Sequence, residues 1–263
     1  MKKASILFSA LLLICSCCGT PKTNEEVTTG TVIVHPDSSS TYVAEGSIPV
    51  KAESDMKWIT RFADQIEHLE AKAAADSISD IDVVFFGSSS IRLWKGLEEM
   101  MSPLRVVNRG YGGATIRDIH YNYKSIMAHY NPKAFVIFCD NDIAGNRNDL
   151  TTGEVLDHYR VLFQRLEQDY PGKPVFFLSW KYSDLRARLR DKQRIVNHLI
   201  EEYADKSEQV TFVDVNSLLL NEDGEVNSAL FENDNLHINR DGYLLWTSVL
   251  KPQLMEICWP DQK

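Results

Sequence analysis

Five short apolar runs, rich in Val, Ile and Phe, alternate with longer helix-like stretches along most of this chain of 263 residues. This alternation constrains the fold more than any other feature of the sequence. The runs cover residues 82–86, 106–107, 134–138, 174–180 and 210–215, and the helix-like stretches cover about 93–101, 115–130, 153–169, 185–204 and 241–257. Nearly continuous apolar runs are typical of strands that are covered on both faces. The order therefore predicts an α/β fold, with a five-stranded parallel sheet in a three-layer α/β/α sandwich.

This sandwich is predicted to occupy residues 54–263, because a helical apolar face formed by Ile59, Phe62, Ile66 and Leu69 precedes the first run. In a sheet of this kind the ligand binds at the carboxyl ends of the strands. The loops that directly follow the strands are therefore expected to carry the chemistry.

The first 18 residues have a basic start, Lys2 and Lys3, and then a short apolar run. That run is too short for a bilayer-spanning helix of about 20 residues and has the size of a signal-peptide core. Its end, Ile14-Cys15-Ser16-Cys17, resembles the bacterial lipobox, which implies a signal peptide over residues 1–16 and lipidation of Cys17. The alternative is a secreted protein in which the cysteine cluster has no role.

Residues 17–53 are rich in Thr, Ser, Glu, Pro and Gly and show little periodicity, so they are predicted to be a flexible tether between the lipid anchor and the folded domain. The formal net charge of the whole chain is −9, and the loss of Lys2 and Lys3 would make it −11. This acidic balance argues against nucleic-acid binding. Cys18, Cys139 and Cys258 have no paired spacing and form neither a disulfide framework nor a zinc motif. Cys139 lies in an apolar run and is expected to be buried.

Two of the loops after the strands are rich in serine or glycine. Residues 87–90 read Gly-Ser-Ser-Ser between a strand and a helix, where a serine can be either a nucleophile near a helix N-terminus or a helix cap. Residues 108–113 read Asn-Arg-Gly-Tyr-Gly-Gly, and their backbone N–H groups can receive an oxyanion or simply form a tight turn. A dinucleotide-binding loop is disfavoured, because Thr115 stands where its third glycine would be.

Two further loops carry acidic, amide and imidazole groups. Residues 140–142 read Asp-Asn-Asp, in which the amide of Asn141 can donate to an oxyanion, the group can form a turn, or its oxygens can bind a metal. Near the C-terminus, Asp234 and His237 are three residues apart, so the carboxylate can orient the imidazole from one short turn.

The four motifs in this order resemble the SGNH hydrolases, also called the GDSL esterase/lipase superfamily, over about residues 54–257. The text GSSSIRLW followed by NRGYGG is most similar to a bacterial branch related to platelet-activating-factor acetylhydrolase-like and carbohydrate esterases. Two departures stand out: Ser88 replaces the usual Asp of the first motif, and Cys139 replaces the usual Gly of the third. The resemblance implies a flavodoxin-like sheet and no metal or cofactor.

The resemblance also implies a role for each matching residue. Ser89 would be the nucleophile, His237 the general base and Asp234 its partner. The oxyanion hole would be formed by the N–H groups of Ser89 and Gly113 and by the side-chain amide of Asn141. The G-x-S-x-G elbow of α/β-hydrolases is absent, because Ile91 stands where the second glycine would be.

The short loops between the motifs favour a small acyl group, and acetyl esters of a carbohydrate in the bacterial cell envelope are the first expectation for the substrate. The aromatic residues Trp94, Tyr111, Trp180 and Tyr182 near the strand ends are interpreted either as faces that hold a sugar or as packing at the rim. A lysophospholipase or thioesterase is the second enzymatic hypothesis. A catalytically inactive carbohydrate-binding member is the non-enzymatic one. The membrane contact is expected through the lipid anchor only, on an outer-membrane or periplasmic face.

Overall fold

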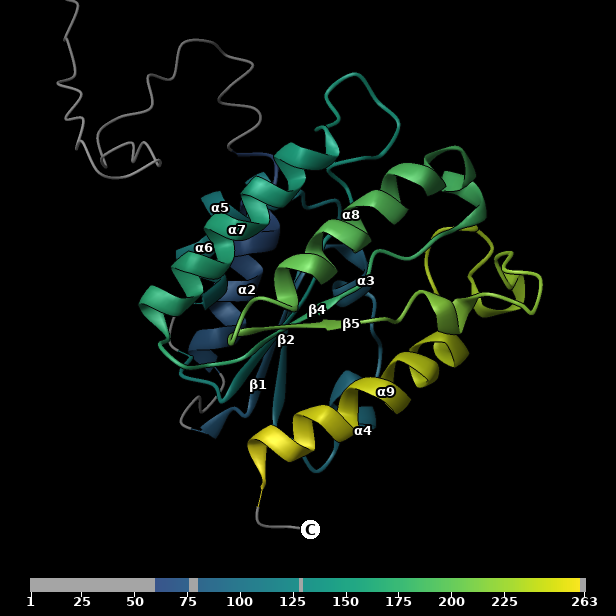
Figure 1. Cartoon of the computed structure of the whole chain (residues 1–263). Helices are drawn as coiled ribbons and strands as arrows, with labels where there is room; N and C mark the ends of the chain where they lie inside the picture. The colour runs from purple at the N-terminus through teal and green to yellow at the C-terminus, as the bar shows by residue number, and fades with distance from the viewer. Residues whose placement is uncertain (1–59, 76–79, 128–129, 261–263) are drawn as a thin grey trace, which may run out of the picture. The chain divides into compact units, whose positions relative to one another are not determined.

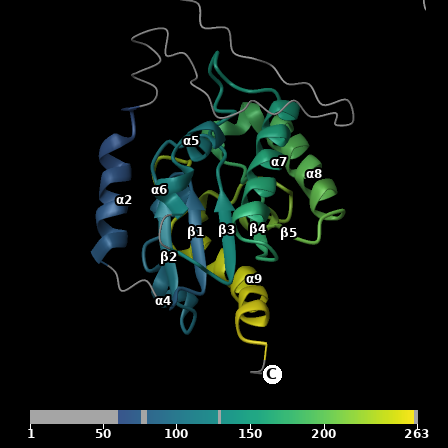
Figure 2. The same cartoon turned by 90° about the vertical axis from the view of Figure 1, so that its left-hand side faces the viewer.

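The computed structural model describes residues 60–75, 80–127 and 130–260, and at its centre is a sheet of five parallel strands. The strands are β1 (Val83–Gly87), β2 (Val106–Gly110), β3 (Ala134–Phe138), β4 (Val175–Leu178) and β5 (Val210–Val213). Their order in the sheet is β2-β1-β3-β4-β5, as Figure 2 shows. The predicted five-stranded parallel sheet is confirmed.

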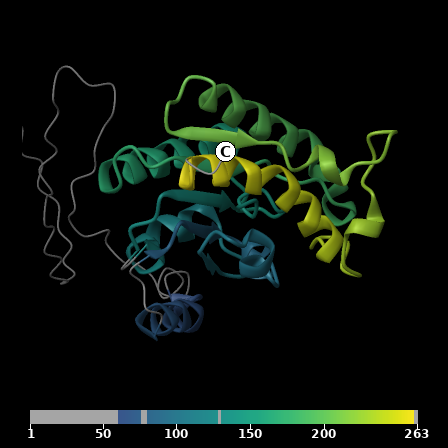
Figure 3. The ribbon, with the colours of Figure 1, turned by 90° about the horizontal axis from the view of Figure 1, so that it is seen from below.

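Helices cover both faces of the sheet and make the three predicted layers (Figures 1 and 3). One face packs against α2 (Ala63–Ala75), α5 (Ile116–Tyr121), α6 (Tyr123–Met127), α7 (Thr152–Asp169) and α8 (Arg190–Ala204). The other face packs against α3 (Ser89–Arg92), α4 (Leu97–Met101) and α9 (Arg240–Cys258). Strand residues alternate between the two cores: Val84 and Phe86 of β1 belong to the first, and Val83 and Phe85 to the second. Both faces are therefore apolar, as the continuous runs predicted.

Three short 3₁₀ helices complete the elements that bear on the site: η2 (Asp184–Leu189), η3 (Ser217–Leu219) and η4 (Ser228–Leu230). The predicted helix at 185–204 begins as η2 and continues as α8. The predicted stretch at 93–101 is helical only in its second part, because Gly96 adopts a left-handed conformation and is the N-cap residue before α4. The stretch at 115–130 contains two short helices that are divided at Asn122.

The second strand is longer than the two apolar residues that predicted it. Asn108 and Arg109 pair with Phe85 and Phe86 of β1 although both are polar. Arg109 is fully buried because its guanidinium donates to the backbone carbonyls of Leu69 and Ile126, which lie in helices α2 and α6. Long-range partners of this kind allow a charged residue to continue a central strand.

A capping box starts each of two helices on the first face. Thr115 at the start of α5 accepts from the Asp118 N–H, while the Asp118 carboxylate accepts from the Thr115 N–H. Thr151 and Glu154 form the same arrangement at the start of α7. These pairs satisfy backbone donors that would otherwise lack a partner, and the first of them fixes the end of the loop after β2.

The predicted signal peptide, the lipidation site Cys17 and the tether at 17–53 lie outside the described residues. Within the described part of the chain, no helix is both long enough and apolar enough to cross a bilayer. Cys139 and Cys258 are both buried free thiols. The expected burial of Cys139 is confirmed.

Candidate active site

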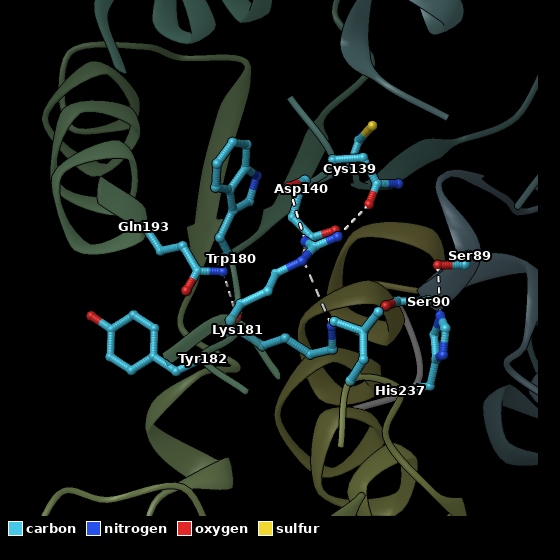
Figure 4. A network of polar contacts seen from close by, with 12 residues as sticks. Ser89, Ser90, Cys139, Asp140, Trp180, Lys181, Tyr182, Gln193 and His237 are labelled. Atoms are coloured by element: carbon cyan, nitrogen blue, oxygen red, sulfur yellow. Dashed lines mark hydrogen bonds and ion pairs between the residues drawn. The ribbon is translucent and has the colours of Figure 1, made fainter. Parts of the chain in front are cut away.

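A serine from the first half of the sequence and an aspartate–histidine pair near the C-terminus form a continuous hydrogen-bonded chain at the carboxyl end of the sheet. The Ser89 Oγ lies 2.9 Å from the His237 Nε2, and the His237 Nδ1 lies 2.5 Å from an Asp234 carboxylate oxygen. Figure 4 shows the contact between Ser89 and His237. The structure therefore brings together the serine, the imidazole and the carboxylate that the sequence singled out.

The chemistry of these partners fixes the direction of the hydrogen bonds. An ionised carboxylate only accepts, so the His237 Nδ1 carries the proton that it donates to Asp234. In the neutral imidazole the Nε2 is then the acceptor, and the Ser89 hydroxyl donates to it. This is the arrangement in which a histidine can remove a proton from a serine.

A tight turn holds Asp234 in place beside His237. One oxygen of the Asp234 carboxylate accepts from the backbone N–H groups of Leu236 and His237, each at 2.9 Å, while the other accepts from the imidazole. Asn235 within this turn has a φ of 53°, a conformation that asparagine tolerates better than most residues. Burial raises the pKa of Asp234, but the hydrogen bonds from His237 and Leu236 outweigh this effect and bring the pKa down to about 2. Asp234 is therefore a carboxylate at neutral pH.

Ser89 is placed by a close approach between two strands. Gly87 at the end of β1 has a φ of 136°, and a Cβ there would lie 2.0 Å from the Phe138 carbonyl oxygen, so only glycine fits. The next residue, Ser88, donates its N–H to the same carbonyl at 2.8 Å. Ser89 is then the first residue of α3, half-buried, and Tyr243 of α9 anchors that helix by donating to the Ser90 carbonyl at 2.8 Å.

The capping interpretation of the three serines is only partly correct. Ser88 is the N-cap residue of α3, but its side chain makes no capping hydrogen bond. Ser89 lies inside the helix and directs its hydroxyl to His237 instead.

The loops after β2 and β3 contact each other through Ala114 and Asn141. Gly113 has a φ of 80°, which side chains disfavour. The next carbonyl, that of Ala114, accepts from the Asn141 Nδ2 at 2.9 Å. The Cys139 thiol lies 3.2 Å from the same oxygen. Asn108 fastens β2 to α3 by donating to the Ile91 carbonyl at 2.6 Å.

The two acidic residues beside Asn141 are engaged with the protein itself. Asp140 is buried and forms ion pairs with Arg186 at 2.9 Å and with Lys181 at 3.7 Å. Asp142 is also buried and accepts from the Ile116 N–H at 2.7 Å. Across the described ranges, no three His, Cys, Asp or Glu side chains gather where they could hold a metal ion. These residues do not fit the metal-binding alternative, because Asp140 faces two cations.

Sequence reasoning missed Lys181 and Arg186, which follow β4 and lie behind Asn141. A charged residue shortly after an apolar strand is a signal that could have found Lys181, whereas Arg186 lies farther along, inside η2, and no comparable signal marks it. The aromatic residues singled out near the strand ends are mostly packing residues. Trp94, Tyr111 and Trp180 are at most 2% exposed, so they offer no free face to a sugar, and only Tyr182 is half-buried.

Two cavities flank the serine-bearing helix. One of about 470 Å³ includes Asp234 and His237. Its other lining residues are Leu93, Lys95, Glu232, Ile238, Asn239, Arg240 and Tyr243. The second, of about 750 Å³, lies between α2 and the segment from Arg92 to Tyr111. The first cavity is lined by His237 and Asp234, whereas Ser89, Gly113 and Asn141 are not among the lining residues of either cavity.

Comparison with known proteins identifies the family and the fold of this chain. The model of the GDSL-like Lipase/Acylhydrolase family matches residues 58–245. The alpha2 subunit of human platelet-activating factor acetylhydrolase IB is 26% identical over 182 residues, which cover 67% of this chain and 77% of that protein. The bovine alpha1 subunit is 24% identical over 216 residues, which cover 80% and 88%.

Among solved structures, a GDSL-like lipase from Bacteroides thetaiotaomicron superposes with a TM-score of 0.61 at 18% identity. The superposition covers 73% of this chain and 97% of that one, and it shows the same fold. The family match extends over most of the chain and includes the loops of Ser89, Gly113, Asn141 and the Asp234–His237 turn. The chain thus belongs to the GDSL-like lipase/acylhydrolase family, the SGNH hydrolases, and is an ester hydrolase.

Proposed function

We propose that this protein is a serine esterase in which Ser89 is the nucleophile and His237 the general base. Asp234 orients the imidazole and stabilises its protonated form. The observation that carries this proposal is the continuous chain from the Ser89 Oγ through His237 to Asp234. His237 takes the serine proton as Ser89 attacks the ester carbonyl. The imidazolium formed in this step is stabilised by Asp234. It then gives the proton to the leaving alcohol, and water hydrolyses the acyl-enzyme by the same route.

The negative charge that develops on the carbonyl oxygen needs donors on the side opposite His237. In the proposal these are the backbone N–H groups of Ser89 and Gly113 and the Nδ2 of Asn141. Each such donor contributes about 10²–10³ in turnover where it has been removed from a related kind of site. No cofactor takes part in any step.

The test uses p-nitrophenyl acetate and a fluorophosphonate probe that reacts with activated serines. Ser89→Ala should lose turnover and labelling. The matched control is Ser88→Ala, because the Ser88 Oγ is buried, has no hydrogen-bond partner among the described residues and lies one residue away. Wild-type turnover by Ser89→Ala would refute the assignment of the nucleophile. If the wild type neither labelled nor hydrolysed any ester, the hypothesis of an inactive carbohydrate-binding member would replace the proposal.

For the substrate we propose an acetyl ester of a carbohydrate. The mammalian relatives are named acetylhydrolases, which supports a small acyl group. The cavity beside His237 includes Lys95, Glu232, Asn239 and Arg240, whose polar groups suit the hydroxyls of a sugar better than a lipid tail. A panel of acetylated xylan, other acetylated glycans, p-nitrophenyl esters of increasing length, lysophospholipid and acyl-CoA tests this choice. A preference for lysophospholipid or acyl-CoA would favour the lysophospholipase or thioesterase hypothesis.

For the location we propose a lipid anchor on Cys17 that holds the enzyme at the bacterial cell envelope. The support is the lipobox-like sequence at residues 14–17. Cys17→Ala should abolish incorporation of labelled palmitate and move the protein from the membrane fraction to the soluble one. Cys18→Ala is the matched control and should leave both unchanged, and palmitate labelling of Cys17→Ala would contradict the proposal.

A further inference from the structure

Both polar atoms of the Asn141 side-chain amide have hydrogen-bond partners, and each partner is compatible with only one orientation of the amide. Its Oδ1 lies 2.6 Å from the Arg186 Nη2, and its Nδ2 lies 2.9 Å from the Ala114 carbonyl oxygen. A guanidinium only donates and a carbonyl only accepts, so a reversed amide would lose both hydrogen bonds. The contacts select one of the two orientations that an asparagine can otherwise exchange.

The selected orientation is the one that an oxyanion hole requires. The Nδ2 carries two hydrogens, and the Ala114 carbonyl takes one of them, which leaves the other free for the developing oxyanion. A reversed Asn141 would instead present its Oδ1, an acceptor that repels negative charge. We propose that Arg186 is a positioning residue, which acts through Asn141 to keep the amide N–H directed at the oxyanion. This inference rests on the proposed function, since it presumes that Asn141 is a donor in the hole.

Arg186 is itself fixed by buried charge. Its side chain is 9% exposed, and its Nη1 lies 2.9 Å from the Asp140 carboxylate and 3.1 Å from the Asp140 carbonyl oxygen. Lys181, 1% exposed, approaches the same carboxylate at 3.7 Å, and burial lowers its pKa. Figure 4 shows Asp140 and Lys181 in the same view as Ser89 and His237. One arm of the guanidinium is thus held by Asp140, and the other arm reaches Asn141.

The 3₁₀ helix η2, which carries Arg186, also contacts the other half of the site. The Leu185 N–H donates to the Asn235 carbonyl at 3.1 Å, within the turn that joins Asp234 to His237. Asp184 accepts from the Ser228 hydroxyl at 2.8 Å. Arg186 departs from helical geometry, with φ −110° and ψ 20°, between neighbours that face solvent. This short helix therefore links the proposed oxyanion donor to the turn of the general base.

An ordinary structural arginine would not need this geometry. A buried ion pair is often no more stabilising than apolar side chains of similar volume. The forked guanidinium, in contrast, can grip a carboxylate with one arm and orient an amide with the other, which a lysine cannot do. The arrangement favours a role in orienting Asn141 over a role in filling space.

The first test compares Arg186→Met with the matched control Arg188→Met. Arg188 belongs to the same 3₁₀ helix, but it is exposed and donates to the Gly145 carbonyl at 3.1 Å. Arg186→Met should lower kcat on p-nitrophenyl acetate about 10- to 100-fold, a part of the loss for a missing oxyanion donor, with KM changed less than about twofold. Arg188→Met should keep the wild-type kcat.

Arg186→Lys provides a second variant that keeps the charge beside Asp140 and so should fold. It loses the arm that reaches Asn141, so its kcat should fall by about three- to tenfold, less than in Arg186→Met. Folding of each variant is followed by thermal unfolding. If Arg186→Met does not fold, the comparison rests on Arg186→Lys.

A double-mutant cycle with Asn141→Ala separates positioning from general damage. If Arg186 acts through Asn141, replacing Arg186 in the Asn141→Ala background should change kcat by less than about twofold. Losses that multiply in the double variant, or a folded Arg186 variant with wild-type kcat, would overturn the inference.

The outcomes also separate this inference from the proposed function. If Ser89→Ala abolishes turnover while the Arg186 variants are unaffected, the esterase mechanism stands and only the role of Arg186 fails. If the wild-type protein shows neither turnover nor fluorophosphonate labelling, the proposed function fails and the inference falls with it.

Discussion

The Asp142 carboxyl is buried in a setting that makes its ionisation costly. Its side chain is fully buried, with one oxygen 2.7 Å from the Ile116 N–H and the other 3.9 Å from the Arg117 Nε. Burial raises the pKa of Asp142 to about 7, against the lowering effect of the Ile116 N–H and Arg117, and the nearby carboxylates of Asp118 and Asp140 raise it further. Replacing this carboxyl by a neutral amide should therefore change stability in a pH-dependent way.

The sign and size follow from proton linkage. The ordinary pKa of this carboxyl is 3.8, so between about pH 4 and 7 the native state holds a proton that the unfolded chain has released. The contribution of Asp142 to the free energy of unfolding therefore falls as pH rises through this window. The rise in pKa to about 7 corresponds to a loss of about 4 kcal/mol above pH 7, of which about 3 kcal/mol develops between pH 5 and 8.

Asp142→Asn removes this pH-dependent contribution to the free energy of unfolding, because the amide is neutral at every pH. Its Oδ1 can still accept from the Ile116 N–H. The free energy of unfolding of the variant minus that of the wild type should therefore be about 3 kcal/mol higher at pH 8 than at pH 5, which means that the variant gains relative stability at the higher pH. Urea unfolding of both proteins at the two pH values measures this difference and cancels the titration of other groups. The matched control is Asp223→Asn, which makes the same substitution on an exposed turn. The reasoning would be refuted if the free energy of unfolding of Asp142→Asn minus that of the wild type were equal at the two pH values, or lower at pH 8.

Three further predictions concern the turn, the loop and a buried ion pair. Asp234→Asn should lower kcat on p-nitrophenyl acetate by about 10³–10⁴ with little change in KM, because the imidazolium loses its carboxylate; a loss below tenfold would contradict this. Gly113→Ala and Gly172→Ala both place a side chain at a positive φ, 80° and 71°, so each should cost about 1–2 kcal/mol in the free energy of unfolding. Only Gly113→Ala should also lower kcat. Equal kcat values in the two variants would contradict the proposed role of the Gly113 N–H in the oxyanion hole. Lys133→Met removes the partner that lies 2.9 Å from the buried Asp82, whose pKa is lowered, and should cost about 1–3 kcal/mol at pH 7. The loss should shrink as pH falls below 4, where Asp82 becomes protonated, and a loss independent of pH would exclude the ion pair as its cause.

The sheet could be predicted from the sequence because its strands are buried on both faces. The run at 134–138 coincides with β3, and the other runs differ from their strands mainly at the ends. The second strand was underestimated, because Asn108 and Arg109 interrupt the apolar pattern. Arg109 belongs there only because carbonyls of two distant helices accept its hydrogen bonds, and such partners are not visible in local sequence.

The site could be predicted where a motif placed a polar group directly beyond a strand. Ser89 and Asn141 were singled out in this way, whereas His237 lies well beyond the end of β5 and was singled out by its spacing from Asp234 and by the resemblance to the SGNH hydrolases. Arg186 lies several residues beyond the end of β4, inside a short 3₁₀ helix, and its side chain turns back into the protein. Its role depends on a three-dimensional contact with Asn141, which no spacing in the sequence reports.

At both departures from the family motifs a backbone contact holds the loop, and at Cys139 the thiol adds a contact with the Ala114 carbonyl oxygen. Ser88 replaces an aspartate, yet the contact that positions it is made by its N–H with the Phe138 carbonyl. Its hydroxyl is buried and has no hydrogen-bond partner in the part of the chain that the structure describes. Cys139 replaces a glycine, yet it is fully buried, and its carbonyl accepts from the Tyr159 hydroxyl at 2.6 Å. Neither change removes a contact that Ser89 or Asn141 makes. A loop of this family can therefore carry a different residue beside its functional one and still present the serine hydroxyl or the asparagine amide at the end of the sheet.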